Sequence, residues 1–259
     1  MSSKWPWEKV YVLNLDKDKD KWNIMKKQLK SLNIKGDRFS AVYGLDKFPF
    51  GDKIKKVKEE NKKWQLIEKM NEKLKKEGHV HRDVGNNEKS KFPYMRPGEL
   101  GHLASFLKIF QDIVTRGYEQ VLILEDDCLF TEGFKKKFFE SYNNLPENWN
   151  LFYLGVNQIH LDSTPKPENV NSKICRLKPI IPKNPKKKYK YGAIYGTHAM
   201  LIKRKTAKEW LHFAYPFRYP SDIVMGKIIN KYNRINAYYP CYQLVEATSD
   251  IDNSSTRLI

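Results

Sequence analysis

Short apolar runs alternate with amphipathic segments along this chain. Residues 9–15 (KVYVLNL) are apolar at nearly every position, which is typical of a strand covered on both faces. Similar apolar runs predict further strands at residues 38–43, 121–124, 151–154, 199–202 and 235–239. Between them lie segments with helical spacing, so the pattern predicts alternating strands and helices.

The first predicted helix illustrates that spacing. Trp22, Met25, Leu29 and Leu32 recur at steps of three and four, after Asp16 and Asp18, either of which could cap the helix. Other helices are predicted near residues 98–117, 132–144, 206–213 and 221–232. A strand, a helix and a strand within about forty residues form the βαβ unit of a parallel sheet. We therefore predict one α/β domain over residues 1–259, with a mostly parallel central sheet flanked by helices.

Two basic segments interrupt this alternation. Residues 53–91 carry 13 Lys or Arg against 7 Asp or Glu, yet Val57, Trp64, Ile67, Met70 and Leu74 keep a helical stripe. We predict a basic helical insertion that lies on the domain. Residues 162–191 hold five of the thirteen prolines, and nine basic residues against two acidic ones. This composition predicts a long, mobile, basic loop.

The net charge of +18 is compatible with a polyanionic partner, an anionic membrane surface or a solvated Lys-rich exterior, and charge alone does not choose among them. No apolar stretch reaches the roughly 18 residues of a membrane span, and the opening residues lack the apolar core of a signal peptide. Three cysteines, without metal-ligand spacing, disfavour a disulfide scaffold or a zinc knuckle. We expect a cytoplasmic protein, soluble or peripheral to a membrane.

The acidic triplet Glu125-Asp126-Asp127 directly follows the predicted strand 121–124. Open α/β sheets bind their ligands at the carboxyl ends of the strands. Carboxylates with pKa values of about 4 repel one another at neutral pH. Mn²⁺ or Mg²⁺ relieves this repulsion and also binds a substrate diphosphate. The triplet therefore indicates a metal–diphosphate site, the alternative being a solvated acidic turn that caps the next helix.

The triplet belongs to an ordered set of short segments: residues 12–16 (VLNLD), 38–44 (RFSAVYG), 97–101 (PGELG) and 122–127 (LILEDD). Weaker members follow at residues 196–199 (GTHA), 220–222 (PSD) and 249–251 (SDI). Together, across nearly the whole chain, these segments resemble glycosyltransferase family 25. That family contains lipooligosaccharide glycosyltransferases and procollagen galactosyltransferases.

The resemblance implies a GT-A-like nucleotide-sugar fold and inverting transfer of a sugar, galactose or glucose, from a UDP-sugar to a hydroxyl on a glycan or protein. It implies Mn²⁺ or Mg²⁺ on Asp127 and Glu125, and Asp222 as the general base that takes the proton of the acceptor hydroxyl. Asp222 also follows Ser221 at a predicted helix start, so a capping role is the alternative. The residues implied to bind the donor are Asn14, Leu15, Ser105, Glu125 and Asp126.

Two positions depart from the family pattern. The family usually has Ser-His where this chain has Ser105-Phe106, and its Arg after the first Asn-Leu is replaced here by Trp22 or neighbouring lysines. Both changes affect donor positioning. They leave a second hypothesis open, in which the fold is a non-catalytic basic protein that binds nucleic acid or an anionic glycan.

Other chemistry-bearing residues have weaker signals. His79 and His81 could bind a metal but are more typical of a helix surface. His198 either faces the donor or is a hydrogen-bonded strand residue, and Glu99 is either a second catalytic carboxylate or a partner of the helix dipole. Aromatic residues are sparse among the lysines of residues 183–190, which disfavours nucleic acid as a partner.

Overall fold

An eight-stranded sheet in the order β2-β1-β3-β10-β5-β11-β8-β7 forms the centre of the protein. The computed structural model describes residues 4–47, 53, 56, 58–77, 97–155, 158–159, 168–177, 194–217 and 219–248. The strands are β1 (Lys9–Asn14), β2 (Asp37–Ser40), β3 (Gln120–Glu125), β5 (Leu151–Tyr153), β7 (Glu168–Asn169), β8 (Ile174–Leu177), β10 (Ala199–Lys203) and β11 (Ala237–Pro240). Only β10 and β8 run against the other strands of this sheet. The expected mostly parallel α/β architecture is confirmed.

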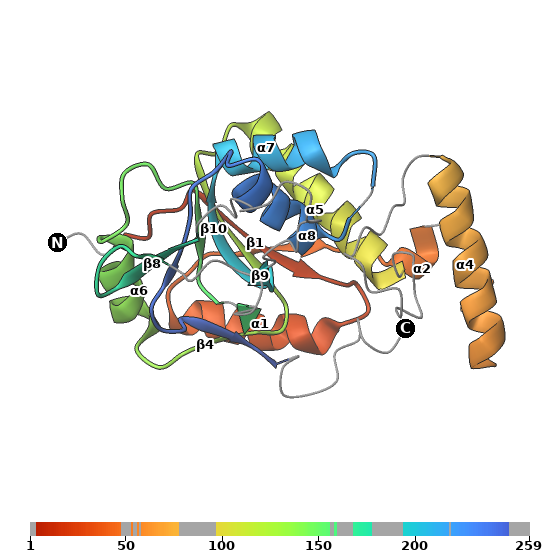
Figure 1. Ribbon diagram of the computed structural model, residues 1–259. Coiled ribbons are helices and arrows are strands. Elements are labelled where there is room, and N and C mark those ends of the chain that lie inside the picture. Colours follow the sequence, from red (N-terminus) through yellow and green to blue (C-terminus); the bar gives the residue numbers. More distant parts are fainter. Residues whose placement is uncertain are drawn as a thin grey trace.

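Helices cover both faces of the sheet (Figure 1). Helices α5 (Pro97–Arg116), α7 (Arg204–Ala214) and α8 (Ser221–Gly226) pack on one face, and α8 continues into the π-helical turn η1 (Lys227–Lys231). Helices α1 (Lys19–Ser31) and α6 (Phe134–Tyr142) pack on the other. Two short pairs of strands, β4 (Cys128–Phe130) with β12 (Val245–Ala247) and β6 (Gln158–Ile159) with β9 (Ile194–Tyr195), lie outside the main sheet.

The packing of helices on both faces of the sheet explains why the central strands are continuously apolar. Along β3, Val121 and Ile123 enter the core under α5 and α7, whereas Leu122 and Leu124 enter the core under α1 and α6. All four side chains are fully buried. Burial of each such side chain contributes about 1.5–3 kcal/mol, so a polar residue at any of these positions would be costly.

Close backbone contacts fix the start of α5. A Cβ added to Gly44 would lie 1.6 Å from the carbonyl oxygen of Pro97, and one added to Gly101 would lie 2.4 Å from that of Val42. Only glycine permits this approach, which brings the short helix α2 (Gly44–Lys47) against α5. The first turns of α5 are thereby held beside the carboxyl ends of β1 and β3.

Several predictions require correction. The strand expected over residues 38–43 ends at Ser40, because residues 44–47 turn into α2. Part of the expected loop at 162–191 instead forms β7 and β8, since Ile174 and Leu177 pack into the core beside β11. Residues 162–167, 178–191 and 249–251 lie outside the described residues.

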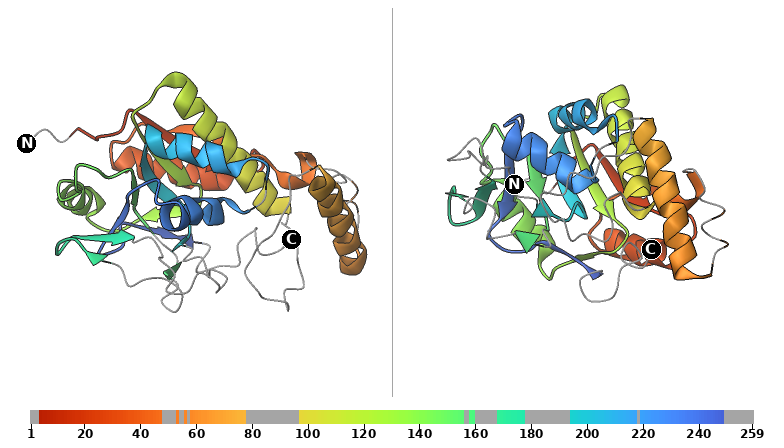
Figure 2. Two further views of the ribbon diagram at one scale, coloured as in Figure 1. Left: turned by 45° about the horizontal axis from the view of Figure 1, so that its top comes forward. Right: turned by 45° about the vertical axis from the view of Figure 1, so that its right-hand side comes forward.

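The basic insertion contains helix α4 (Glu60–Lys76), on which Ile67, Met70 and Leu74 are buried. The Trp64 side chain, Val57 and residues 78–91 are outside the described part of the chain. Figure 1 and the left view of Figure 2 show α4 at the edge of the molecule, away from the sheet. No helix within the described ranges is both long and apolar enough to span a bilayer.

Candidate functional site

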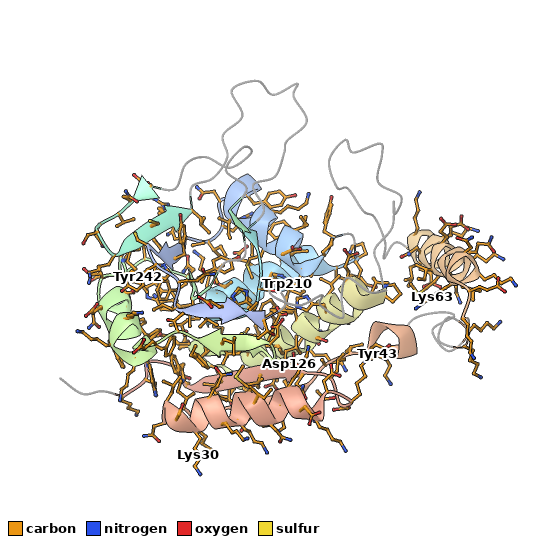
Figure 3. The ribbon with its side chains drawn as sticks, turned by 90° about the horizontal axis from the view of Figure 1, so that it is seen from below. Lys30, Tyr43, Lys63, Asp126, Trp210 and Tyr242 are labelled. Carbon is orange, nitrogen blue, oxygen red and sulfur yellow. The ribbon has the colours of Figure 1, made fainter. Side chains whose placement is uncertain are left out.

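The acidic triplet lies at the carboxyl end of β3, with its side chains divided between the two faces of the sheet. Glu125 is the last residue of β3 and turns toward α5 and α8, as Ile123 does. Asp126 turns the opposite way, toward α1, and is labelled near the middle of Figure 3. The Asp127 carbonyl accepts a hydrogen bond from the Thr248 amide at 2.9 Å, which ties the turn to the end of β12.

A histidine connects Glu125 to α8. His102 Nε2 lies 3.1 Å from Glu125 Oε1, and Nδ1 of the same ring lies 2.7 Å from Ser221 Oγ. Thr197 donates its hydroxyl to Glu125 Oε1 at 2.8 Å. Three segments that are distant in sequence therefore meet at one carboxylate.

The pair of His102 and Glu125 is electrostatically coupled. Their side chains are only 23% and 25% exposed. Burial opposes the charged form of each, but the attraction and the hydrogen bond between them outweigh burial. The pKa of His102 is therefore raised above its ordinary value, and the pKa of Glu125 is lowered to about 2. At neutral pH Glu125 is a carboxylate held by two donors.

Asp126 belongs to a second polar group at the end of β1. Asn14 is buried, donates from Nδ2 to Asp126 Oδ2 at 2.6 Å and to the Asp18 carbonyl at 2.9 Å, and accepts from Arg38 Nε at 2.6 Å. Lys21 Nζ lies 3.8 Å from Asp126 Oδ1. Burial raises the pKa of Asp126 to about 6 in spite of the Asn14 hydrogen bond and the Lys21 charge. The charges of Asp127 and Asp18 also raise this pKa, so negative charge is crowded at this edge of the sheet.

Asp222 lies in the first turn of α8, next to the Ser221 that contacts His102. Its Oδ1 accepts a hydrogen bond from the Ile223 amide at 2.8 Å, so it satisfies one first-turn N–H group. Burial, and to a lesser extent the charge of Glu99, raise the Asp222 pKa, although the Ile223 hydrogen bond and His102 oppose the rise. Pro220 occupies the N-cap position of α8, so Asp222 stabilises the helix start from inside the first turn and not as its cap. It also has the raised pKa suited to a general base.

A pocket of about 170 Å³ opens at the carboxyl ends of β5 and β11. One of its walls is Tyr153, a residue at the end of β5 whose pKa is raised by burial and, to a lesser extent, by the negative charge of Asp222. Gly155 is required there, because a Cβ would lie 2.0 Å from the Val245 carbonyl oxygen. The pocket is lined by Tyr153, Leu154, Gly155, Tyr239, Pro240, Cys241, Tyr242 and Gln243.

The structure brings most of the predicted site residues to one edge of the sheet. Asn14 ends β1, and the half-buried Leu15 follows it. Glu125 ends β3, and Asp222 is connected to it through Ser221 and His102. This edge is formed by the carboxyl ends of parallel strands, where α/β folds bind their ligands.

Ser105 has a different position from the one expected of a donor-binding residue. It is fully buried, donates its hydroxyl to the Gly101 carbonyl at 2.7 Å and accepts from the Val42 amide at 2.8 Å. Its observed contacts therefore hold the segment after β2 against α5. Phe106 is also fully buried, and its ring centroid lies 4.7 Å from that of His102.

The remaining candidates are placed as follows. His198 is buried, with Nε2 3.5 Å from the Val245 carbonyl oxygen, as in the structural alternative. Glu99 lies in the first turn of α5, near Asp222. His79, His81 and residues 183–190 are outside the described residues.

His102, Thr197 and Arg38 are site residues that were not predicted from the sequence. The sequence did contain a signal for His102. It precedes Phe106 by four residues and therefore lies on the same face of the helix as the position where the family usually has a histidine. A histidine is thus supplied one turn earlier than the family's usual Ser-His position. Arg38 contacts both Asn14 and Asp16 from β2, so a guanidinium reaches the end of β1 from a neighbouring strand.

The side chains at this site can be compared with the ligands that Mn²⁺ or Mg²⁺ requires. Among the residues that the structure describes, no three His, Cys, Asp or Glu side chains form a metal centre by themselves. These hard cations are commonly bound through one or two carboxylates together with substrate phosphates. The crowded carboxylates fit that requirement. Because Glu125 Oε1 already accepts from His102 and Thr197, Asp127 is the first candidate ligand.

Comparisons with known proteins bear on this site. A family model described as glycosyltransferase family 25 (LPS biosynthesis protein) matches residues 7–225. Procollagen galactosyltransferase 2 of Homo sapiens is 28% identical over 83 residues, which are 31% of this chain and 13% of that protein. The probable inactive glycosyltransferase 25 family member 3 of Bos taurus is 35% identical over 66 residues, which are 24% of this chain and 11% of that protein. The chain therefore spans a small part of these relatives.

A solved structure is also similar over part of the chain. It is described as mannose-1-phosphate geranyltransferase from Thermus thermophilus, with 10% identity and a TM-score of 0.31. The alignment covers 56% of this chain and 51% of that one. A likeness of this size is too slight to bear on function.

Proposed function

Because the chain belongs to glycosyltransferase family 25, we propose that it is a metal-dependent transferase that moves a hexose from a UDP-sugar to a hydroxyl acceptor, with inversion at the anomeric carbon. Galactose and glucose are the proposed sugars, and a glycan or a protein side chain is the proposed acceptor. The family description and the procollagen galactosyltransferase match support these acceptor classes.

One observation carries the proposal. One histidine connects the acidic end of β3 to the first turn of α8, with His102 Nε2 at Glu125 and Nδ1 at Ser221, and Asp222 is the next residue of that turn. Inverting transfer needs a group that binds the leaving diphosphate on one side of the sugar and a base on the other. The connected arrangement supports both roles within one site.

Each group has a proposed task. Asp127, with Glu125 as a second ligand, would hold Mn²⁺ or Mg²⁺, which supplies positive charge against the leaving diphosphate. Asn14 and Leu15 would lie under the nucleotide at the end of β1. Asp222 takes the proton of the acceptor hydroxyl as its oxygen attacks the anomeric carbon. General base catalysis of this kind typically contributes about 10²–10⁴-fold to the rate.

The pocket at the ends of β5 and β11 supports an acceptor position on the Asp222 side of the site, because its wall residue Tyr153 interacts with the Asp222 charge. Its walls include three tyrosines, and aromatic rings and phenol groups suit the apolar faces and hydroxyls of a sugar. The net charge of +18 would also favour an anionic acceptor or a membrane surface that carries one. Nucleic acid is not proposed as a partner.

A second candidate function is a non-catalytic binding protein on the same fold. It is favoured by the match to a probable inactive family member and by Phe106 at the family's histidine position. Such a protein would bind a glycan or another polyanion without transferring a sugar. The two candidates differ in donor hydrolysis and in metal-dependent nucleotide binding.

The test is to incubate the full chain with individual UDP-sugars and Mn²⁺, and to measure UDP release with and without glycan acceptors. We expect UDP release with UDP-galactose or UDP-glucose, and a rise in melting temperature with UDP plus Mn²⁺ because ligands stabilise the state that binds them. Asp127→Asn should lose the Mn²⁺-dependent rise in melting temperature with UDP. Asp20→Asn, an exposed change on α1, is the matched control. Absence of UDP release from every donor, together with no rise in melting temperature with UDP plus Mn²⁺, would favour the second candidate.

A further inference from the structure

Two cysteines meet at the outer part of the main sheet. Cys175 lies in β8, Cys241 directly follows β11, and their Sγ atoms are 2.8 Å apart. Antiparallel pairing places Tyr239 opposite Cys175, and the Cys241 amide donates to the Lys173 carbonyl at 2.9 Å. Backbone pairing therefore holds the two sulfurs about 0.8 Å beyond the length of a disulfide bond, which is about 2.0 Å.

The two thiols differ in access to solvent. Cys241 is exposed, whereas Cys175 is buried and donates to Asn169 Oδ1 at 3.2 Å. Burial, with the adjacent Cys241, raises the pKa of Cys175 to about 11, although a hydrogen bond with Tyr239 opposes the rise. A soluble reagent therefore meets Cys241 first, and Cys175 reacts only with a partner already beside it.

We propose that Cys175 and Cys241 form a site of reversible thiol–disulfide exchange whose reactant is a small soluble disulfide such as oxidised glutathione. The Cys241 thiolate attacks one sulfur of the reagent, which breaks the reagent's S–S bond, forms a mixed disulfide and releases one glutathione thiolate. Cys175 then loses its proton and attacks Cys241 Sγ. The protein disulfide forms, the second glutathione leaves as a thiolate, and the released thiolates take up protons. Two protein thiols are oxidised and one glutathione disulfide is reduced.

The bond would connect two parts of the chain that matter to the site. It would close the segment between residues 175 and 241, which carries β10, α7 and α8, and with them Asp222. Its Cys241 end lies in the wall of the pocket at the ends of β5 and β11. Because a crosslink reduces the freedom of the unfolded chain, the oxidised protein should melt at a higher temperature than the reduced protein. This inference stands independently of the proposed transferase activity.

The test is to equilibrate the full chain with mixtures of reduced and oxidised glutathione, block free thiols by alkylation and identify disulfides by mass spectrometry. We expect one intramolecular bond, between Cys175 and Cys241. Its equilibrium constant with glutathione should be at least about tenfold more favourable in the folded chain than in urea, because folding holds the sulfurs together. An equal or smaller constant in the folded chain would overturn the proposal.

Variants separate the two steps. Cys175→Ser should accumulate a glutathione adduct on Cys241, and Cys241→Ser should form neither the adduct nor the bond. Cys128→Ser is the matched control, because Cys128 is buried and donates to the His198 carbonyl at 2.8 Å. The Cys128→Ser variant should form the Cys175–Cys241 bond as the parent does. A folded parent protein that accumulates the adduct on Cys241 without forming the bond would contradict the inference, and this result needs no variant.

Discussion

Replacement of His102 tests the link between β3 and α8. His102→Leu removes the charge and both hydrogen bonds, whereas His102→Gln keeps an amide donor without the charge. Hydrogen bonds to charged groups contribute about 1.5–3 kcal/mol net, and partial exposure of both side chains favours the lower half of that range. Thr197 continues to donate to Glu125 in the variant. We therefore expect His102→Leu to lose about 1.5–2 kcal/mol.

The loss should depend on pH with a definite sign. The raised pKa of His102 gives stability that is present below the ordinary histidine value of 6.5 and lost as pH rises through the folded value. The lowered pKa of Glu125 gives stability that is present above the ordinary value of 4.5 and lost as pH falls through the folded value. The difference between the parent and His102→Leu should therefore be largest between about pH 4.5 and 6.5.

The assay is urea unfolding of the parent, His102→Leu and His102→Gln from pH 4 to pH 9. His212→Gln, an exposed change in the last turn of α7, is the control and should leave stability unchanged. A loss of about 1.5–2 kcal/mol corresponds to about 3–8 °C in melting temperature for a chain of this size. A difference between parent and His102→Leu that stays constant across this pH range would refute the ion-pair reasoning.

Three further predictions concern the site and its support. Asp222→Asn should slow turnover at saturating donor by about 10²-fold or more with little change in melting temperature; a destabilised variant with normal turnover would leave Asp222 only the role of stabilising the start of α8. Asp127→Asn should weaken Mn²⁺-dependent UDP binding in calorimetry while Asp20→Asn does not, and equal affinities would exclude Asp127 as a ligand. Gly155→Ala should cost about 2–3 kcal/mol in urea unfolding, because its Cβ would clash with the Val245 carbonyl; parent-like stability would contradict the close packing.

The sequence alone determined most of the α/β layout. The run around Val12 and the run 121–124 became β1 and β3 because both faces of these strands are covered, so no polar position interrupts them. The acidic triplet was recognisable for the same reason, since it begins where a buried strand ends. The resemblance to the family's motifs indicated Asp222 as a candidate base. In the structure its neighbour Ser221 is connected to the end of β3 through His102.

Only the tertiary structure determined the features that depend on contacts between segments distant in the chain. Four-residue β8 was too short and too close to prolines to stand out, and it forms because β11 supplies its hydrogen bonds. His102 reaches Ser221 across 119 residues, and Cys175 reaches Cys241 across 66. Periodicity reports which face of an element is buried, but it does not report which elements are neighbours. The contacts at the site arise from the packing of α5 and α8 on the same face of the sheet, a packing that no local pattern encodes.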